Sequence, residues 1–175
     1  MILPGRSLIT PRKIISGAIS PPLQSQPCGV DLTLRRVLTW TAAGAVDFDN
    51  RLRRTAPTEA VFTSTSPKHP AAQADQTGVH LASGSYLVEF NETVAVPLDA
   101  MGQIFVRRSL FRSGALLSGG VVDSGYSGAI GALLQVLNPF GLRLHDNAKL
   151  AQLVLHQMSE PVEGYNGVYQ GSKAM

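Results

Sequence analysis

Glycines and prolines recur throughout the chain and divide it into short apolar segments, and this spacing restricts the fold more than any other feature. The 175 residues include 17 glycines and 11 prolines. The segments between them are rich in Val, Leu, Ile, Phe and Thr, most of which favour strands. Short strands separated by regular turn signals predict an all-β sandwich or barrel. Five segments are predicted strands: residues 86–90, 93–98, 103–110, 129–138 and 148–158.

Three other features complete the predicted organisation. Residues 6–17 are the only plausible helix, and Pro11 reduces the expectation to a short helix or turn packed on the sheet. Residues 148–158 contain good helix formers, yet their all-β context favours a strand. Residues 63–78 have almost no large apolar side chain and are predicted to form a loop. We find no internal repeat and expect a single domain over residues 1–175.

Composition excludes several classes of protein. The net charge is +3 and no run of Lys or Arg exceeds two residues, so we expect no nucleic-acid partner. The single cysteine, Cys28, rules out an internal disulfide and a cysteine-rich zinc site. No apolar run approaches the roughly 18 residues of a membrane span, and the N-terminus lacks the apolar core of a signal peptide. We therefore predict a cytoplasmic protein that binds no membrane.

Basic residues gather at Arg51, Arg53 and Arg54, and again in RRSLFRSG, residues 107–114. The first group is typical of a solvated face. If the second group is an extended strand entering a turn, Arg107 and Ser109 point to one face and Arg108 to the other. One guanidinium group can donate hydrogen bonds to two phosphate oxygens at once, so this segment is a candidate phosphate site. From this segment alone, a basic strand end that faces solvent is the favoured interpretation.

Two further segments, GGVVDSGYSG (residues 119–128) and GYNGVYQGSKAM (residues 164–175), have both structural and functional interpretations. Asp123 lies in a predicted hairpin-like turn, where it could cap its own backbone. The surrounding glycines would also let a ligand approach the main chain, with Tyr126 as a flat wall. The C-terminal segment is either a frayed end or an arm that folds over a ligand. The four histidines show no metal-ligand spacing, and the GxSxG, P-loop and GxGxxG motifs are absent from the sequence.

Taken in order, these motifs resemble the dUTPase and dCTP deaminase superfamily. QPCGVDL, RRSLFRSG, GGVVDSGYSG, LLQVLN, AKLAQL and YNGVYQGS follow one another from about Pro22 to Ser172, with residues 39–85 unplaced. The resemblance implies a distorted jelly-roll β-barrel that assembles as a homotrimer, with active sites between subunits. It also implies a pyrimidine deoxynucleoside triphosphate as substrate, with magnesium bound through the phosphates.

The turn motif most resembles that of a dUTPase, which hydrolyses dUTP to dUMP and pyrophosphate and so clears the nucleotide pool and supplies a dTTP precursor. Residues 120–126 match G-x-I-D-x-x-Y, with Val for Ile. The resemblance implies that Asp123 orients the attacking water and that Tyr126 stacks on the deoxyribose, which leaves no room for a 2′-hydroxyl. The main chain of residues 119–135 would read uracil.

Two alternatives remain open. A dCTP deaminase, or a bifunctional deaminase and diphosphatase, needs a glutamate at the place held by Gln135, and residues 124–145 contain no Glu or Asp. A neutral glutamine cannot relay a proton as a carboxylate does. Arg108 also replaces the first serine of the deaminase-like R-S-S-x-x-R motif. The other alternative is a non-catalytic trimer that binds nucleotides, which Arg108 and Val168 would favour.

The resemblance assigns the remaining site residues. It implies phosphate contacts from Arg107, Ser109, Arg112 and Gln152. The C-terminal arm (residues 160–175) closes over the nucleotide and resembles Y-x-x-K-Y-Q-G-Q, where Val168 replaces the lysine and Ser172 the last glutamine. Asp31 either holds the water shell of the metal, as in dUTPases, or is structural, as in deaminase-type members. The arm's candidate substrate contacts are Tyr165, Tyr169, Gln170, Ser172 and Lys173, the last as a replacement for the missing charge.

Overall fold

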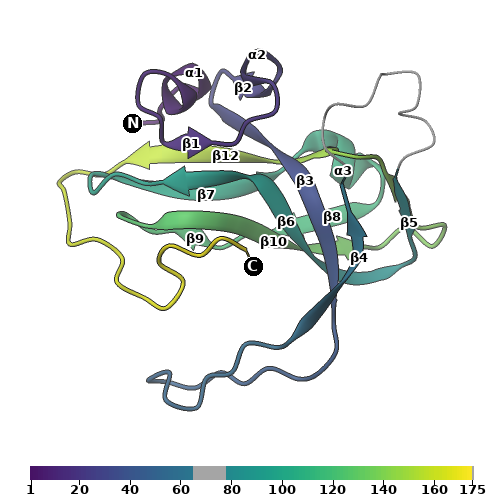
Figure 1. Ribbon diagram of the computed structural model, residues 1–175. Helices are drawn as coiled ribbons and strands as arrows, with labels where there is room; N and C mark the ends of the chain where they lie inside the picture. The colour runs from purple at the N-terminus through teal and green to yellow at the C-terminus, as the bar shows by residue number, and fades with distance from the viewer. Residues whose placement is uncertain (65–77, 175) are drawn as a thin grey trace.

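Antiparallel strands dominate the computed structural model, which describes residues 1–64 and 78–174 (Figure 1). Ten strands form one curled sheet, and seven of them follow the order β8-β10-β6-β3-β12-β7-β9. Their bounds are β8 Ala115–Ser118, β10 Ser127–Val136, β6 Gly84–Ala95, β3 Gly29–Trp40, β12 Lys149–Gln157, β7 Ala100–Val106 and β9 Val121–Val122. The predicted all-β, jelly-roll-like fold is confirmed.

The remaining elements are short and lie at the margins of this sheet. β1 (Ile15–Ser16) pairs with β6, whereas β2 (Ser25–Gln26) and β4 (Thr58–Thr63) pair with β3. β5 (Val79–Leu81) and β11 (Leu142–Leu144) form a separate two-stranded sheet. Helices α1 (Gly5–Ile9) and α2 (Pro21–Gln24) lie together over one face of the sheet (Figure 1). None of the helices in residues 1–64 and 78–174 has the length and apolar character needed to cross a membrane.

The long central strand β3 makes the sheet curl. Its first half pairs with β12 and its second half with β6, and the register with β6 shifts between Leu34 and Arg36. A bulge of this kind bends a strand and increases its twist. Residues 29–34 are all buried, although successive side chains point to opposite faces. One face therefore meets the apolar core, and the other is covered by the N-terminal segment with α2.

Three of the predicted strands are confirmed, in β6, β10 and β12, and residues 93–95 continue β6. The prediction of a strand over residues 103–110 is wrong after Val106, because residues 108–112 form helix α3 (Arg108–Arg112). Pairing with β12 ends at Val106, and α3 then buries Leu110 while the rest of the helix stays exposed. Alternation of Arg107, Arg108 and Ser109 between two faces is therefore wrong as well.

The N-terminal prediction is confirmed, since α1 is a short helix that ends before Pro11 and buries Leu8. Residues 39–85, unplaced in the sequence, contain the end of β3 together with β4 and β5. Residues 41–57 between β3 and β4, here called the β3–β4 extension, project from the body of the molecule (Figure 1). Of the predicted loop at 63–78, residues 65–77 lie outside the described residues.

Candidate functional site

Asp123 begins a tight turn, residues 123–126, between β9 and β10. The main chain of the turn is fixed to the neighbouring segment, because the Gly125 N–H donates to Val96 O at 2.9 Å and the Val96 N–H to Tyr126 O at 2.8 Å. The Asp123 residue is exposed, and in the described part of the chain its carboxylate accepts no hydrogen bond. An Asx turn would need such a bond, so both carboxylate oxygens are available to a ligand.

This turn is not a hairpin, contrary to the prediction. β9 pairs with β7, whereas β10 pairs with β6 and β8, so the two strands flanking the turn have different neighbours. The turn instead carries the chain from one part of the curled sheet to another. Asp123 consequently lies at a junction between strand pairs rather than at the tip of a ribbon.

Tyr126 is held in a fixed orientation. Its hydroxyl donates to Ala129 O at 2.6 Å, and its ring meets that of Tyr165 edge to face, with centroids 5.6 Å apart. Burial, and to a smaller extent the neighbouring Tyr165, raises the pKa of Tyr126. The phenol therefore stays protonated and remains a donor, and its ring presents a rigid surface beside the turn.

The C-terminal segment, residues 160–174 and here called the tail, folds back over this turn. The Gln170 carboxamide spans the turn, because its Oε1 accepts from the Ser127 N–H at 3.0 Å and its Nε2 donates to Gly125 O at 2.9 Å. The Tyr165 N–H also donates to Ser124 O at 2.8 Å. These bonds place the tail on the turn and argue against a frayed terminus.

Beyond Gln170 the tail runs along the start of β10 in the manner of an added strand. The Gly171 N–H donates to Ser127 O at 2.7 Å, and the Ala129 N–H donates to Ser172 O at 2.8 Å. Lys173 follows with an exposed side chain, and its carbonyl accepts from Arg35 Nη1 at 3.4 Å. The tail therefore occupies main-chain groups within residues 119–135, the segment expected to read the base.

Two glycines make this close approach possible. Gly125 has φ +77°, and a Cβ there would lie 2.7 Å from the Cα of Gly164 in the tail. At Gly128 a Cβ would lie 3.0 Å from Ser172 O. Any larger residue would therefore push the tail away from the turn.

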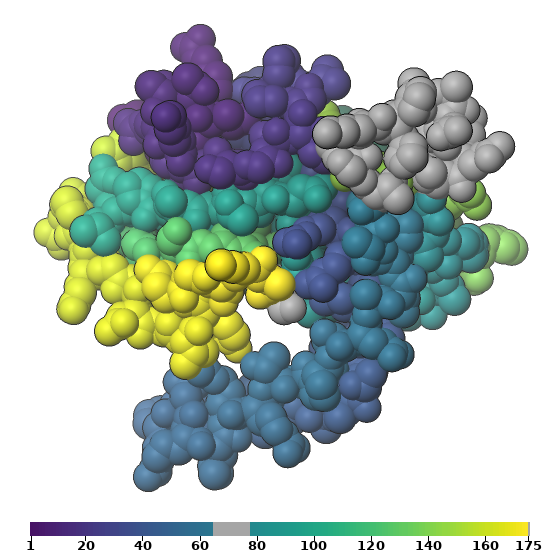
Figure 2. All heavy atoms as spheres, viewed as in Figure 1, coloured from purple at the N-terminus to yellow at the C-terminus, as the bar shows by residue number. Residues whose placement is uncertain are grey.

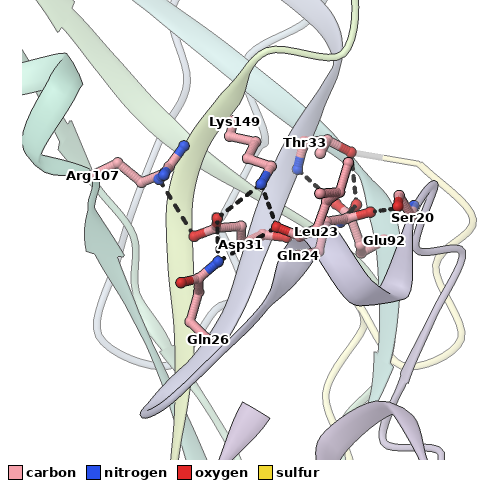
Figure 3. Close-up of polar contacts among 9 residues, drawn as sticks. All are labelled: Ser20, Leu23, Gln24, Gln26, Asp31, Thr33, Glu92, Arg107 and Lys149. Carbon is pink, nitrogen blue, oxygen red and sulfur yellow. Dashed lines mark hydrogen bonds and ion pairs between the residues drawn. The ribbon is translucent and has the colours of Figure 1, made fainter. Parts of the chain in front are cut away.

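A second cluster surrounds the buried carboxylate of Asp31 (Figure 3). Its Oδ1 lies 3.3 Å from Arg107 Nε, and its Oδ2 lies 3.3 Å from Lys149 Nζ and 3.2 Å from Gln26 Nε2. The Lys149 ammonium also donates to Leu23 O. The carboxylate thus fixes the Arg107 side chain, which keeps 34% of its surface exposed and can still reach a ligand.

The other predicted phosphate contacts lie near this Asp31 cluster or on α3. Gln152 is directly opposite Asp31 in the pairing of β12 with β3. Ser109 and Arg112 are exposed on α3, which follows Arg107. The sequence interpretation missed Gln26 and Lys149, although Lys149 lies within the AKLAQL motif that pointed to Gln152.

Glu92 forms a third polar group, also absent from the sequence interpretation and fully buried (Figure 3). It accepts from Gln24 Nε2 and Thr33 Oγ1, both at 2.6 Å, and from the Thr33 N–H at 2.8 Å. Burial raises the pKa of Glu92, although these hydrogen bonds act in the opposite direction. This carboxylate joins α2 to β3 and β6 beneath the surface.

The Asp123 turn and the Asp31 cluster lie toward opposite ends of β7. β9 pairs with the start of that strand, where Gly102 is opposite Val122, whereas Arg107 follows its last residue. Five residues of extended chain span about 16 Å. Gln135 is also remote from the turn, near the other end of β10 beside Leu116 of β8. One chain therefore does not bring together all the residues predicted to contact one nucleotide.

The metal-ligating side chains of the described residues do not form a metal site. Within residues 1–64 and 78–174, no group of three or more His, Cys, Asp or Glu side chains is placed to hold a metal ion. Both oxygens of Asp31 are already paired with cations.

Comparison with known proteins gives consistent similarities. A family model described as dCTP deaminase-like matches residues 6–158. A Methanosarcina mazei protein named probable deoxyuridine 5'-triphosphate nucleotidohydrolase is 37% identical over 158 residues, or 90% of this chain and 86% of the relative. An Archaeoglobus fulgidus protein of the same name is 35% identical over 166 residues, or 95% and 92% of the two chains.

The fold is also found in a solved structure of another protein. The 2'-deoxycytidine 5'-triphosphate deaminase from Agrobacterium tumefaciens superposes with a TM-score of 0.63 at 18% identity. The match covers 89% of this chain and 48% of the other, so this chain spans about half the length of that structure.

Proposed function

The chain belongs to the dCTP deaminase-like family, within the dUTPase and dCTP deaminase superfamily, and on this premise we propose that it hydrolyses dUTP to dUMP and pyrophosphate in the cytoplasmic nucleotide pool. The observation that carries the proposal is the exposed, unpaired carboxylate of Asp123 on a turn fixed by main-chain bonds. From this position it accepts a hydrogen bond from water and aims that water at the α-phosphorus. Phosphoryl transfer asks a protein mainly for such positioning and for charge stabilisation.

The phosphates are bound by the second cluster. Arg107, oriented by Asp31, and Arg112 clamp the phosphate oxygens, with Ser109 and Gln152 as further contacts. We assign Asp31 to this positioning role because its oxygens are already engaged by Arg107 and Lys149. Guanidinium groups suit this task because their planar donors match phosphate geometry.

Magnesium bound to the triphosphate would neutralise phosphate charge, because anionic oxygens are the ligands that it prefers. The side chains of the described residues do not form a site that would hold the ion directly. We therefore assign no step to a protein-bound metal.

The base and sugar are bound at the turn. Main-chain groups of residues 119–135 read uracil, and Tyr126 supports the deoxyribose. Tail residues Tyr165, Tyr169, Gln170, Ser172 and Lys173 cover the nucleotide. Cytosine presents an amino donor where uracil has a carbonyl acceptor, and leaving one buried polar group unpaired costs about 1–3 kcal/mol.

The separation of the two clusters supports a homotrimer with sites between subunits. Asp123 and Arg107 lie toward opposite ends of β7, so a single copy of the chain separates the water-orienting carboxylate from its phosphate clamp. A neighbouring copy that supplies Arg107 to the Asp123 turn would complete the site.

The second candidate is deamination of dCTP, which the shared fold alone would permit. It needs an acid on β10, where the chain carries Gln135 and, between residues 124 and 145, no Glu or Asp. Hydrolysis of dUTP is the activity that these residues support.

The test is product analysis with dUTP and dCTP, with and without magnesium. Asp123→Asn should lower pyrophosphate release from dUTP about 10²- to 10⁴-fold, the usual contribution of a proton-accepting group. The control is Glu59→Gln, which removes one charge at an exposed position on β4. Ammonia from dCTP would establish a deaminase instead. Binding of dUTP without pyrophosphate release by the wild type would establish a non-catalytic binding protein.

A further inference from the structure

The β3–β4 extension, residues 41–57, carries a group of basic residues that the proposed hydrolysis does not use. The extension is closed by its own backbone, because Ala45 and Arg54 exchange two hydrogen bonds of 2.8 and 2.9 Å. At its tip the Leu52 N–H donates to an Asp47 carboxylate oxygen at 2.7 Å. The extension is therefore an ordered projection closed by one β-bridge, although it buries little apolar surface.

One side chain of the tail, Tyr169, is held by this extension. The Arg53 guanidinium lies over the Tyr169 ring, 5.5 Å from its centroid. The Thr55 and Tyr169 hydroxyl oxygens are 3.3 Å apart. Arg53 is itself oriented, since its Nη1 donates to Asn50 Oδ1 at 3.2 Å. Both the face and the polar end of Tyr169 are consequently engaged from the extension.

The next residue of the tail, Gln170, is bound to the turn. Its two hydrogen bonds to Ser127 and Gly125 have been described above. Tyr169 and Gln170 are adjacent in the chain, so the tail is pinned on one side by the extension and on the other by the turn. Figure 2 shows the tail, in yellow, reaching the blue extension at its outer end and leaving a hollow between the two segments.

We propose that the β3–β4 extension anchors the tail, and that Arg53, assisted by Thr55, is a positioning residue that acts through Tyr169 to keep Gln170 and Ser172 on the Asp123 turn. A partly exposed cation over an aromatic face changes the equilibrium between the docked and the lifted tail by a few-fold. The neighbouring Thr55 hydroxyl adds directionality. The consequence for turnover rests on the proposed hydrolysis of dUTP, whereas the anchoring itself does not.

Amide hydrogen exchange of the ligand-free, full-length protein tests the anchoring directly. The Ser127, Ala129 and Gly171 N–H groups bond between tail and turn, so their exchange reports how often the tail lifts. Arg53→Ala should speed their exchange about two- to fivefold, and Arg53→Lys, which keeps a cation over the ring, should restore most of the protection. Amides within β12 should be unchanged in both variants.

Arg51→Ala is the matched control, since it removes the same charge from the same extension and Arg51 pairs with Asp49. Its Ser127, Ala129 and Gly171 amides should exchange at the wild-type rate. Unchanged exchange of these amides in Arg53→Ala, or an equal increase in Arg51→Ala, would overturn the proposal.

Steady-state kinetics with dUTP give the second measurement. Arg53→Ala should raise KM about two- to fivefold with little change in kcat, because it removes an interaction that covers bound substrate without touching the reacting atoms. Combined with Tyr169→Ala, it should add no further effect; additive losses would contradict action through Tyr169. If the wild type does not hydrolyse dUTP, the proposed function fails, and the exchange measurement still decides the anchoring.

Discussion

Asp31 shows how one buried carboxylate can organise a binding surface. Its partners come from β2, the end of β7 and β12, and their side chains remain partly exposed. Asp31→Asn would leave Arg107 and Lys149 without a counter-charge, and both could recover some hydration. We expect a loss of about 1–3 kcal/mol in the free energy of unfolding, measured by urea denaturation, and a higher KM for dUTP. Unchanged values of both would contradict a positioning role.

Glu92 predicts a specific pH dependence of stability. Burial raises its pKa above the ordinary value of 4.5, so from about that pH upward the folded chain holds the proton more tightly than the unfolded chain. The stabilisation of the folded chain by this tighter proton binding is complete below pH 4.5 and is lost as the pH rises through the folded-state pKa of Glu92. The free energy of unfolding of the wild type minus that of Glu92→Gln should therefore fall with rising pH, by at most about 1.4 kcal/mol per pH unit.

Urea denaturation of both proteins at intervals between about pH 4.5 and 7.5 measures this difference. Glu160→Gln, at an exposed position in the tail, is the control and should show no comparable slope against the wild type. A difference that stays flat or rises with pH would contradict the assignment to Glu92.

Single residues differed in how well the sequence indicated their roles. Asp123 could be singled out because glycines and one aromatic residue surround it within ten residues. Lys149 could not be paired with Asp31, and Glu92 could not be paired with Thr33, because strand pairing joins these distant positions. Contacts of that kind depend on register, which a turn pattern does not specify.

At the scale of elements, the tail covers the Asp123 turn, and the Gln170 side chain makes two of the hydrogen bonds that hold it there. Gln170→Ala deletes both side-chain bonds to the turn but leaves the Tyr165 and Gly171 main-chain bonds. Two exposed hydrogen bonds contribute about 1–3 kcal/mol. Ligand-free Gln170→Ala should therefore show faster exchange at Ser127, while exchange along β12 is unchanged.

A deletion of residues 164–175 should have a larger effect than this single change, because it also removes Tyr165 and Tyr169. We expect kcat/KM for dUTP to fall at least tenfold, while the thermal midpoint changes little since the tail is mostly exposed. A truncated protein with wild-type kcat/KM would show that the tail takes no part in hydrolysis.

Elements with a strong local pattern were predictable and the others were not. The strands β10 and β12 were predictable as apolar runs between turn signals, whereas α3 was mistaken for a strand because its residues continue the apolar run of β7. The hairpin prediction failed for a related reason: a turn motif does not reveal which neighbours its flanking strands select. Tertiary pairing decided both outcomes.

At the scale of the whole molecule, the order of motifs was enough to indicate the fold, but the way copies combine into sites can be tested only with the assembled protein. Asp123→Asn and Arg107→Ala should each be nearly inactive alone. If a site takes these two residues from different copies, unfolding and refolding them together at equal amounts should restore about a quarter of wild-type activity, by random assembly. Mixing without refolding is the control. Continued inactivity after refolding would place both residues of a site in one copy.

The strand β7 has a further consequence for such an assembly. With the Asp123 turn near one end and Arg107 at the other, each strand would serve two different nucleotides. A copy carrying both Asp123→Asn and Arg107→Ala would then inactivate the two sites to which it contributes, even when its neighbours are intact. The harm done by a faulty gene copy would exceed its share of the protein made.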